Sequence, residues 1–141
     1  MTAKHDLARE LARVTQGGQR AEVLHIGDLD PSGVHLFTAL AEDVGAMCYG
    51  LDPESAPRFT RLAVTPAQAE AMDLPSAPPK ATDRRAFTGE TVQAEAIPPD
   101  MLSALVRNAI EARQDQEILA SVLSREAGAR AELVARFGDV A

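Results

Sequence analysis

The sequence predicts an α/β protein with a small, mainly parallel sheet and a helical C-terminal region. An apolar run at residues 23–27 has the length of a buried strand, and apolar residues recur at helical spacing directly after it. A second strand pattern at residues 58–64 is again followed by a helix start. Alternation of strand and helix along a chain is typical of α/β folds.

The first part of the chain contains two predicted helices around the first strand. Residues 6–14 have the apolar spacing of a short helix, and Gln-Gly-Gly-Gln at residues 16–19 ends it. After the strand, Asp30 stands where the N-cap of a helix belongs, and Pro31 stands where the first helical residue belongs. We expect this second helix to end near Gly45.

The middle of the chain predicts two further strands and a short helix. Residues 46–51 have the pattern of a brief strand that a turn closes, and residues 58–64 form the next strand candidate. Thr65 and Gln68 then make a capping-box pattern for a short helix that reaches about residue 72.

The last third of the sequence predicts a loop, a strand and a helical tail. Residues 73–85 are rich in proline and polar residues, as in loops, whereas residues 91–97 alternate as in a strand. A helix with a clean apolar stripe begins at residues 98–100. The tail, residues 113–137, is expected to form one long helix or to fold back as two or three.

Composition places the chain among ordinary globular proteins. It has 141 residues, 45% of them hydrophobic and 25% charged, which suits one domain with a real core. The net charge of −7 argues against an extended basic surface for nucleic acid, although bound Mg²⁺ or a second chain would change the local charge. Cys48 is the single cysteine, and we expect it to pack in the core of a cytoplasmic protein. We expect no membrane partner, because no apolar run is long enough to span a bilayer.

Two aspartates follow the first predicted strand. Asp28 and Asp30 are two positions apart, so in an extended segment their carboxylates leave the chain on the same side. Such a pair at the carboxyl end of a strand can share a hard cation such as Mg²⁺. The alternative is that Asp30 only caps the helix and Asp28 only closes the turn. None of the three histidines stands at a metal-ligand spacing, and we expect them to be structural.

Two sequence features resemble the Toprim domain, the metal-binding module of type IA and type II topoisomerases, bacterial primases and certain nucleases. Residues 27–33, Gly-Asp-Leu-Asp-Pro-Ser-Gly, look like the Gly-Asp-x-Asp-Pro-x-Gly of the topoisomerase VI A subunit, its meiotic relatives and a group of phage-type Toprim-like proteins. The string that those phage-type proteins carry further on is similar to residues 61–68, 73–75, 79–85 and 95–99. The resemblance covers residues 22–112 and implies a Rossmann-like sheet of Toprim type.

The resemblance implies DNA phosphodiester chemistry with Mg²⁺ held by Asp28 and Asp30. It also marks Lys80, Asp83 and Arg84 as residues that line the site, where lysine and arginine would hold a phosphodiester. From composition alone, the same segment is a surface connector.

The resemblance also identifies what this sequence lacks. Toprim domains carry a glutamate at the end of an earlier strand as a general acid or base, but only Glu10 and Glu22 precede the aspartates here, and neither has that context. Glu95 is the candidate replacement, followed by Glu22 and Asp83, and the alternative for Glu95 is a solvated surface residue. Topoisomerases cleave DNA with a tyrosine from a separate domain, and Tyr49 does not match that context.

These observations predict three regions and one main function. Residues 1–21 form an N-terminal helix and linker, residues 22–112 a Toprim-like domain, and residues 113–141 a helical tail through which the chain forms a homodimer. The expected function is Mg²⁺ binding for topoisomerase- or nuclease-type DNA chemistry, incomplete on its own, with DNA reached through a partner chain or a missing domain. The alternative is a non-catalytic protein-interaction module on a remnant Toprim fold.

Overall fold

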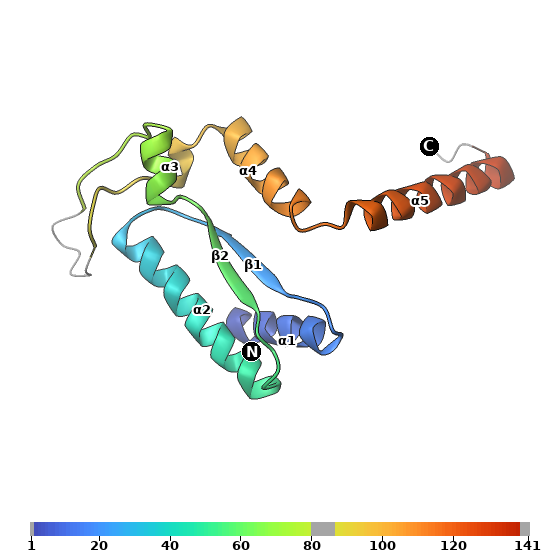
Figure 1. Ribbon diagram of the computed structural model, residues 1–141, viewed down its shortest axis with the longest axis horizontal. Helices are drawn as coiled ribbons and strands as arrows, with labels where there is room; N and C mark the ends of the chain where they lie inside the picture. The colour runs from blue at the N-terminus through green and yellow to red at the C-terminus, as the bar shows by residue number, and fades with distance from the viewer. Residues whose placement is uncertain (1, 80–86, 139–141) are drawn as a thin grey trace. The chain divides into compact units, whose positions relative to one another are not determined.

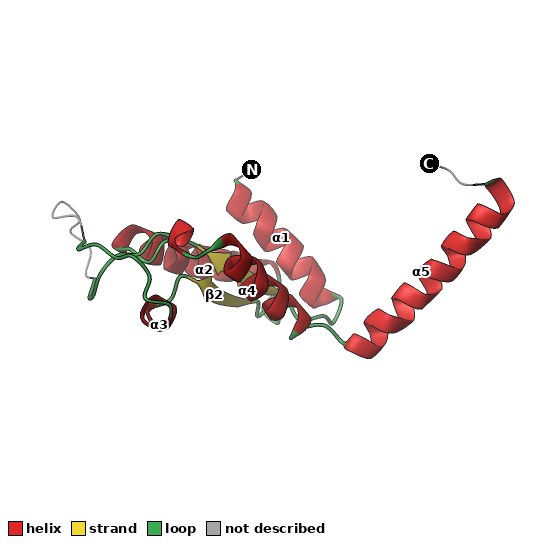
Figure 2. Ribbon diagram, turned by 90° about the horizontal axis from the view of Figure 1, so that it is seen from above, coloured by secondary structure: helices red, strands yellow, loops and turns green. Residues whose placement is uncertain are grey.

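The computed structural model describes residues 2–79 and 87–138. The chain divides into two compact units, residues 1–102 and residues 103–141, with the boundary inside one helix. Helices contain far more of the described residues than strands do (Figure 2). No helix among the described residues has the length and apolarity needed to cross a membrane.

The first unit is built on a pair of parallel strands (Figure 1). Strand β1 (Glu22–Ile26) follows helix α1 (Ala3–Gln16), and helix α2 (Pro31–Leu51) connects it to strand β2 (Arg58–Ala63). A strand, a crossover helix and a parallel strand form the basic unit of α/β folds. The coarse α/β prediction is therefore confirmed, with a sheet of two strands in the described part of the chain.

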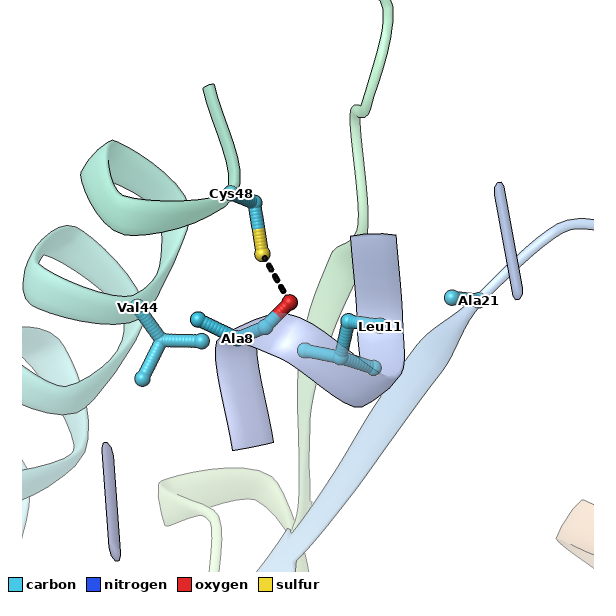
Figure 3. Packing of buried hydrophobic residues seen from close by; sticks show 5 residues of the cluster. All are labelled: Ala8, Leu11, Ala21, Val44 and Cys48. Carbon is cyan, nitrogen blue, oxygen red and sulfur yellow. Dashed lines mark hydrogen bonds between the residues drawn. The ribbon is translucent and has the colours of Figure 1, made fainter. Parts of the chain in front are cut away.

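Helices α1 and α2 cover one face of this sheet. Val23 of β1 pairs with Phe59 of β2 in the strand register, and both side chains pack against the buried cluster between the helices. The fully buried members Ala8 and Val44 bring the two helices together (Figure 3). Leu11, Ala21 and Cys48 complete the buried set. The core of this unit therefore lies between the helix pair and the sheet.

Cys48 belongs to this core, as the sequence predicts. It is fully buried, and its thiol donates to the main-chain oxygen of Ala8 at 3.5 Å (Figure 3). Burial raises the pKa of the Cys48 thiol, which disfavours the thiolate needed for reactivity.

The prediction that α2 ends near Gly45 and gives way to a strand at residues 46–51 is wrong. Helix α2 continues to Leu51. Val44 and Cys48 are four positions apart and both fully buried, so the apolar stripe facing α1 extends past the glycine. Tertiary packing along this stripe decides the helix length, and the weak helix propensity of Gly45 does not.

The short elements after β2 follow their local sequence signals. Helix α3 (Pro66–Ala71) begins with the predicted capping box, in which Thr65 and Gln68 exchange side-chain to backbone hydrogen bonds. The Gln68 side chain also donates to the main-chain oxygen of Leu62 at 2.9 Å, which ties the start of α3 to the end of β2.

The strand predicted at residues 91–97 is wrong. Thr91 and Val92 make only isolated antiparallel bridges, with Ala77 and Leu29, and a 3-10 helix, η1 (Ala94–Ala96), follows directly. The amide of Ala94 bonds to a side chain instead of a neighbouring strand, so the ladder cannot continue.

The C-terminal part of the chain is helical, as predicted. Helix α4 (Pro99–Glu111) begins within residues 98–100, where its start was predicted, and helix α5 (Gln116–Phe137) follows after a short break. Asp115 caps α5 by accepting from the amides of Glu117 and Ile118. Of the arrangements expected for the tail, the structure has a single long helix that runs through Gly128 to Phe137.

Candidate metal-binding turn

The candidate site is the turn at residues 27–33, which connects the carboxyl end of β1 to the start of α2. Its first residue, Gly27, is fixed to the end of the neighbouring strand. Its amide donates to the oxygen of Ala63 at 2.8 Å, and its oxygen accepts from the amide of Val64 at 2.9 Å. The turn therefore stands at the carboxyl edge of both parallel strands, where ligand sites of α/β proteins form.

Asp30 is the N-cap of α2, as the sequence predicts. Its Oδ1 accepts from the amide of Gly33 at 2.5 Å, and Pro31 is the first helical residue. Gly33 approaches the main-chain oxygen of Asp28 so closely that a Cβ would clash with it. The turn is thus compact, and one carboxylate oxygen of Asp30 is committed to the helix.

Asp28 is anchored by a segment 66 positions further along the chain. Its Oδ1 accepts from the amide of Ala94 at 2.8 Å. Beside it, Leu29 and Val92 exchange two backbone hydrogen bonds of 2.8 and 2.9 Å. The segment around residue 92 therefore packs onto the turn and fixes the Asp28 carboxylate. The sequence did not predict this interaction, because a strand was expected at residues 91–97.

The Arg61 side chain stabilises the turn by bonding to main-chain oxygens. Its guanidinium donates to the main-chain oxygens of Val64, Gly27 and Gly33 at 2.9, 2.9 and 3.4 Å, and also to the main-chain oxygen of Asp28. Side chains alternate along a strand, so Arg61 lies on the same face of β2 as Phe59. The side chain is half-buried beneath the turn.

The electrostatics of Arg61 combine desolvation with two nearby carboxylates. Burial lowers the pKa of the Arg61 guanidinium, and the charges of Asp30 and Asp28 oppose that shift. Since the ordinary pKa of arginine is very high, the group stays protonated. Its charge partly balances the two aspartates and its fork shapes the turn that carries them.

Sequence reasoning assigned no role to Arg61. The available signal was a charged residue in the middle of a predicted strand, on the face that also carries Phe59. An arginine in that position must find acceptors, because burying an unpaired charge is costly. The carbonyl oxygens of a tight turn are those acceptors, but sequence alone does not show that this turn lies above β2.

The donor set of the turn fits Mg²⁺ as a pair of carboxylates. Asp28 and Asp30 are both half-buried, and each uses Oδ1 for one backbone amide, which leaves Oδ2 as a ligand atom. Mg²⁺ commonly takes one or two protein carboxylates and fills its other positions with water and substrate phosphates. In the described parts of the chain, no three His, Cys, Asp or Glu side chains are grouped to hold a metal.

The predicted catalytic residues are not assembled around this pair within the described residues. Glu95 is exposed in η1, next to the Ala94 amide that bonds Asp28, and does not join the aspartates in a three-residue metal group. Lys80, Arg84 and Asp83 lie outside the described residues.

The other residues considered from sequence have structural roles or lie elsewhere. Glu22 stands at the opposite end of β1, where its carboxylate accepts from the Thr60 hydroxyl at 2.5 Å. Glu10 pairs with Arg13 on the surface of α1. Tyr49 is 64% exposed near the far end of α2.

His25 is a packing residue, as expected. Its ring stacks on Phe37 of α2 with 4.7 Å between the ring centroids. Burial is the main cause that lowers the pKa of His25, and the nearby charge of Arg61 adds to it.

Comparisons of the chain with protein-family models, with curated proteins and with solved structures found no match.

Proposed function

We propose that the chain is a Toprim-like Mg²⁺-binding module that serves phosphodiester chemistry on DNA together with a partner chain or a further domain. The observation that carries this proposal is the geometry of residues 27–33. Two aspartates stand at the carboxyl end of a parallel strand, and each is fixed by a backbone amide that leaves one carboxylate oxygen for a ligand.

The anchoring of both carboxylates supports metal binding over a purely structural role. A helix cap needs only Asp30, and a tight turn needs no second fixed carboxylate. Here Arg61 shapes the main chain from below, while Ala94 fixes the orientation of Asp28. Such preorganisation reduces the cost of binding a cation.

The chemistry of the proposed site follows from its residues. Asp28 and Asp30 would hold Mg²⁺, which when bound stabilises negative charge on a phosphate and on a leaving oxygen. The described residues place no glutamate with the aspartates in a three-residue metal group. We expect the general acid or base to come from another chain or domain, so isolated protein should not cleave DNA.

The test is calorimetric titration of Mg²⁺ and Mn²⁺ into wild type and into the double variant Asp28→Asn with Asp30→Asn. Asparagine keeps the oxygen that accepts each amide, so the fold should persist while metal affinity is lost. A double variant with Glu42→Gln and Asp100→Asn removes the same charge from exposed positions and should bind metal as wild type does. Equal affinity in wild type and the aspartate variant, or no binding by wild type at millimolar Mg²⁺, contradicts the proposal.

A second assay separates a module from a complete enzyme. Purified wild type should leave supercoiled DNA intact in the presence of Mg²⁺. Nicking that depends on metal and disappears in Asp28→Asn would show an autonomous nuclease instead.

The alternative function is a non-catalytic interaction module, and one observation favours it. Large apolar side chains are exposed along α5, among them Ile118 at 63% and Phe137 at 70%. Wild type that associates through this helix but binds no metal at millimolar Mg²⁺ would support the interaction role alone.

A further inference from the structure

Helix α5 has no packed face within its own unit. Among residues 116–137, only Leu119 is half-buried and all others are exposed. A helix of this kind is marginal in water, because most helical stability in proteins comes from packing an apolar face. The large apolar side chains of α5 that are exposed are Ile118, Val122, Leu123, Leu133, Val134 and Phe137. Apolar surface of this extent is typical of a contact surface.

Six of the seven large apolar residues of α5, all except Ile118, are arranged symmetrically about Gly128. Val122 and Val134 lie six positions on either side of it, and Leu123 and Leu133 lie five positions on either side. Leu119 and Phe137 each lie nine positions away. If a second copy of the helix runs in the opposite direction and is centred on the same residue, each of these six apolar residues coincides with another of the six.

Two charged residues interrupt the apolar face and follow the same symmetry. Glu126 and Arg130 lie two positions before and after Gly128. With Leu123 before them and Val134 after them, they continue a row of residues spaced three or four apart on one side of the helix. Both side chains are exposed, and the described residues include no ion pair between them.

The position of these charges decides the direction in which a second copy of α5 can pack. Two parallel helices in register would place Glu126 against Glu126 and Arg130 against Arg130 inside an apolar contact, which is strongly unfavourable. An antiparallel pair centred at residue 128 places Glu126 of each copy against Arg130 of the other. It also places Val122 against Val134, and it brings opposite ends of the two helix dipoles together.

We infer that two copies of this chain associate through their α5 helices as an antiparallel, two-fold symmetric pair, with two Glu126–Arg130 ion pairs at its centre. In a two-fold contact, each residue of one helix meets the symmetry-related residue of the other. In the row that contains Glu126 and Arg130, every apolar residue then meets an apolar residue, and each charged residue meets one of opposite charge. The inference rests on α5 alone and does not require metal binding by the aspartates.

Charge reversal tests the pairing in the full-length protein. We expect Glu126→Arg and Arg130→Glu each to raise the dimer dissociation constant by about tenfold or more, because each puts like charges together at two places. The combined variant Glu126→Arg with Arg130→Glu restores opposite charges in the antiparallel pair and should dimerise like wild type. Sedimentation velocity over a concentration series measures all four proteins, and circular dichroism checks that helix content is unchanged.

Two results of that experiment would overturn the inference. Wild type that remains a monomer at every concentration would assign the apolar face to a different partner. Single variants that dimerise as strongly as wild type would exclude the antiparallel ion pairs, because parallel packing leaves like charges opposed in wild type and variants alike.

A distance measurement tests the orientation independently. A spin label at Gln116→Cys lies twelve positions from the centre, so two labels in the antiparallel pair should be about 36 Å apart along the helices. In a parallel pair, the labels would be about 10 Å apart. Wild type treated with the same reagent is the control, because its Cys48 is fully buried. A short distance between the labels would contradict the antiparallel arrangement.

Discussion

The guanidinium of Arg61 reaches the main-chain oxygen of Asp28, while the carboxylate of Asp28 bonds to the amide of Ala94. The same residue is therefore held by its backbone from β2 and by its side chain from the segment that precedes α4. Because these contacts come from residues 33 and 66 positions away along the chain, the position of the carboxylate depends on tertiary structure as well as on the turn.

Replacing Arg61 should destabilise the fold. Arg61→Met retains the apolar stem but removes the guanidinium donor from four main-chain oxygens, of which that of Gly27 keeps another donor, the amide of Val64. We expect a loss of about 2–3 kcal/mol in the free energy of unfolding. Arg61→Lys should recover only part of this loss, because an ammonium lacks the planar fork. Urea unfolding measures the effect, and the exposed Arg58→Lys serves as the control. Equal stability of Arg61→Met and wild type would disprove this role.

Gly33 and Gly45 provide a matched pair of glycine substitutions. Gly33→Ala would push a Cβ against the main-chain oxygen of Asp28, so we expect a destabilisation of about 1–3 kcal/mol. Gly45→Ala adds a Cβ in open space inside α2 and should stabilise the protein by about 0.5–1 kcal/mol. Thermal unfolding of both variants gives the comparison, and similar shifts in the same direction would contradict the tight turn.

The Asp28 side chain should protect the Ala94 amide from solvent exchange. Asp28→Ala removes the acceptor, so hydrogen exchange at Ala94 should become faster. Asp28→Asn keeps an acceptor oxygen and should retain most of the protection. NMR-detected exchange distinguishes the two variants, and the Gly33 amide, which bonds to Asp30, is the internal control. Unchanged exchange at Ala94 in Asp28→Ala would show that the contact is dispensable.

His25 should make stability depend on pH. Burial lowers the pKa of His25 in the folded protein, so the unfolded chain binds the proton more readily. The contribution of neutral His25 is complete above its unfolded pKa, near 6.5, and decreases as the pH falls below that value. Denaturant unfolding at pH 7.5 and at pH 5.0 should therefore show a smaller loss of stability in His25→Gln than in wild type. An equal loss in both proteins would exclude this contribution.

Local signals in the sequence predicted the local structure of the site. Asp30 with Pro31 predicted the start of α2, and Thr65 with Gln68 predicted the capping box of α3. In each case, a side chain within three positions satisfies the free amides of a helix end, so no distant residue is needed.

The errors arose where distant residues decide the structure. Packing of Val44 and Cys48 against α1 extends α2 beyond Gly45, and the bond from Ala94 to Asp28 replaces a strand at residues 91–97. Arg61 was missed because three of its four acceptors lie about thirty positions away along the chain. The spacing of apolar residues along the sequence indicates which residues prefer burial, but it does not indicate which segments pack against each other.

The parallel register of the sheet also constrains how the chain can fold. Glu22 pairs with Arg58, so sheet closure joins residues 36 positions apart (58 − 22), and 21 of the residues between them belong to α2. Formed as a helix, that segment is a rod of about 32 Å that returns the chain to the start of β2. Closing the sheet around a preformed rod loses far less chain entropy than closing a flexible loop. The refolding rate should therefore fall when α2 is weakened by a substitution at an exposed position. During refolding, the amides of β1 and β2 should be among the last to gain protection from hydrogen exchange.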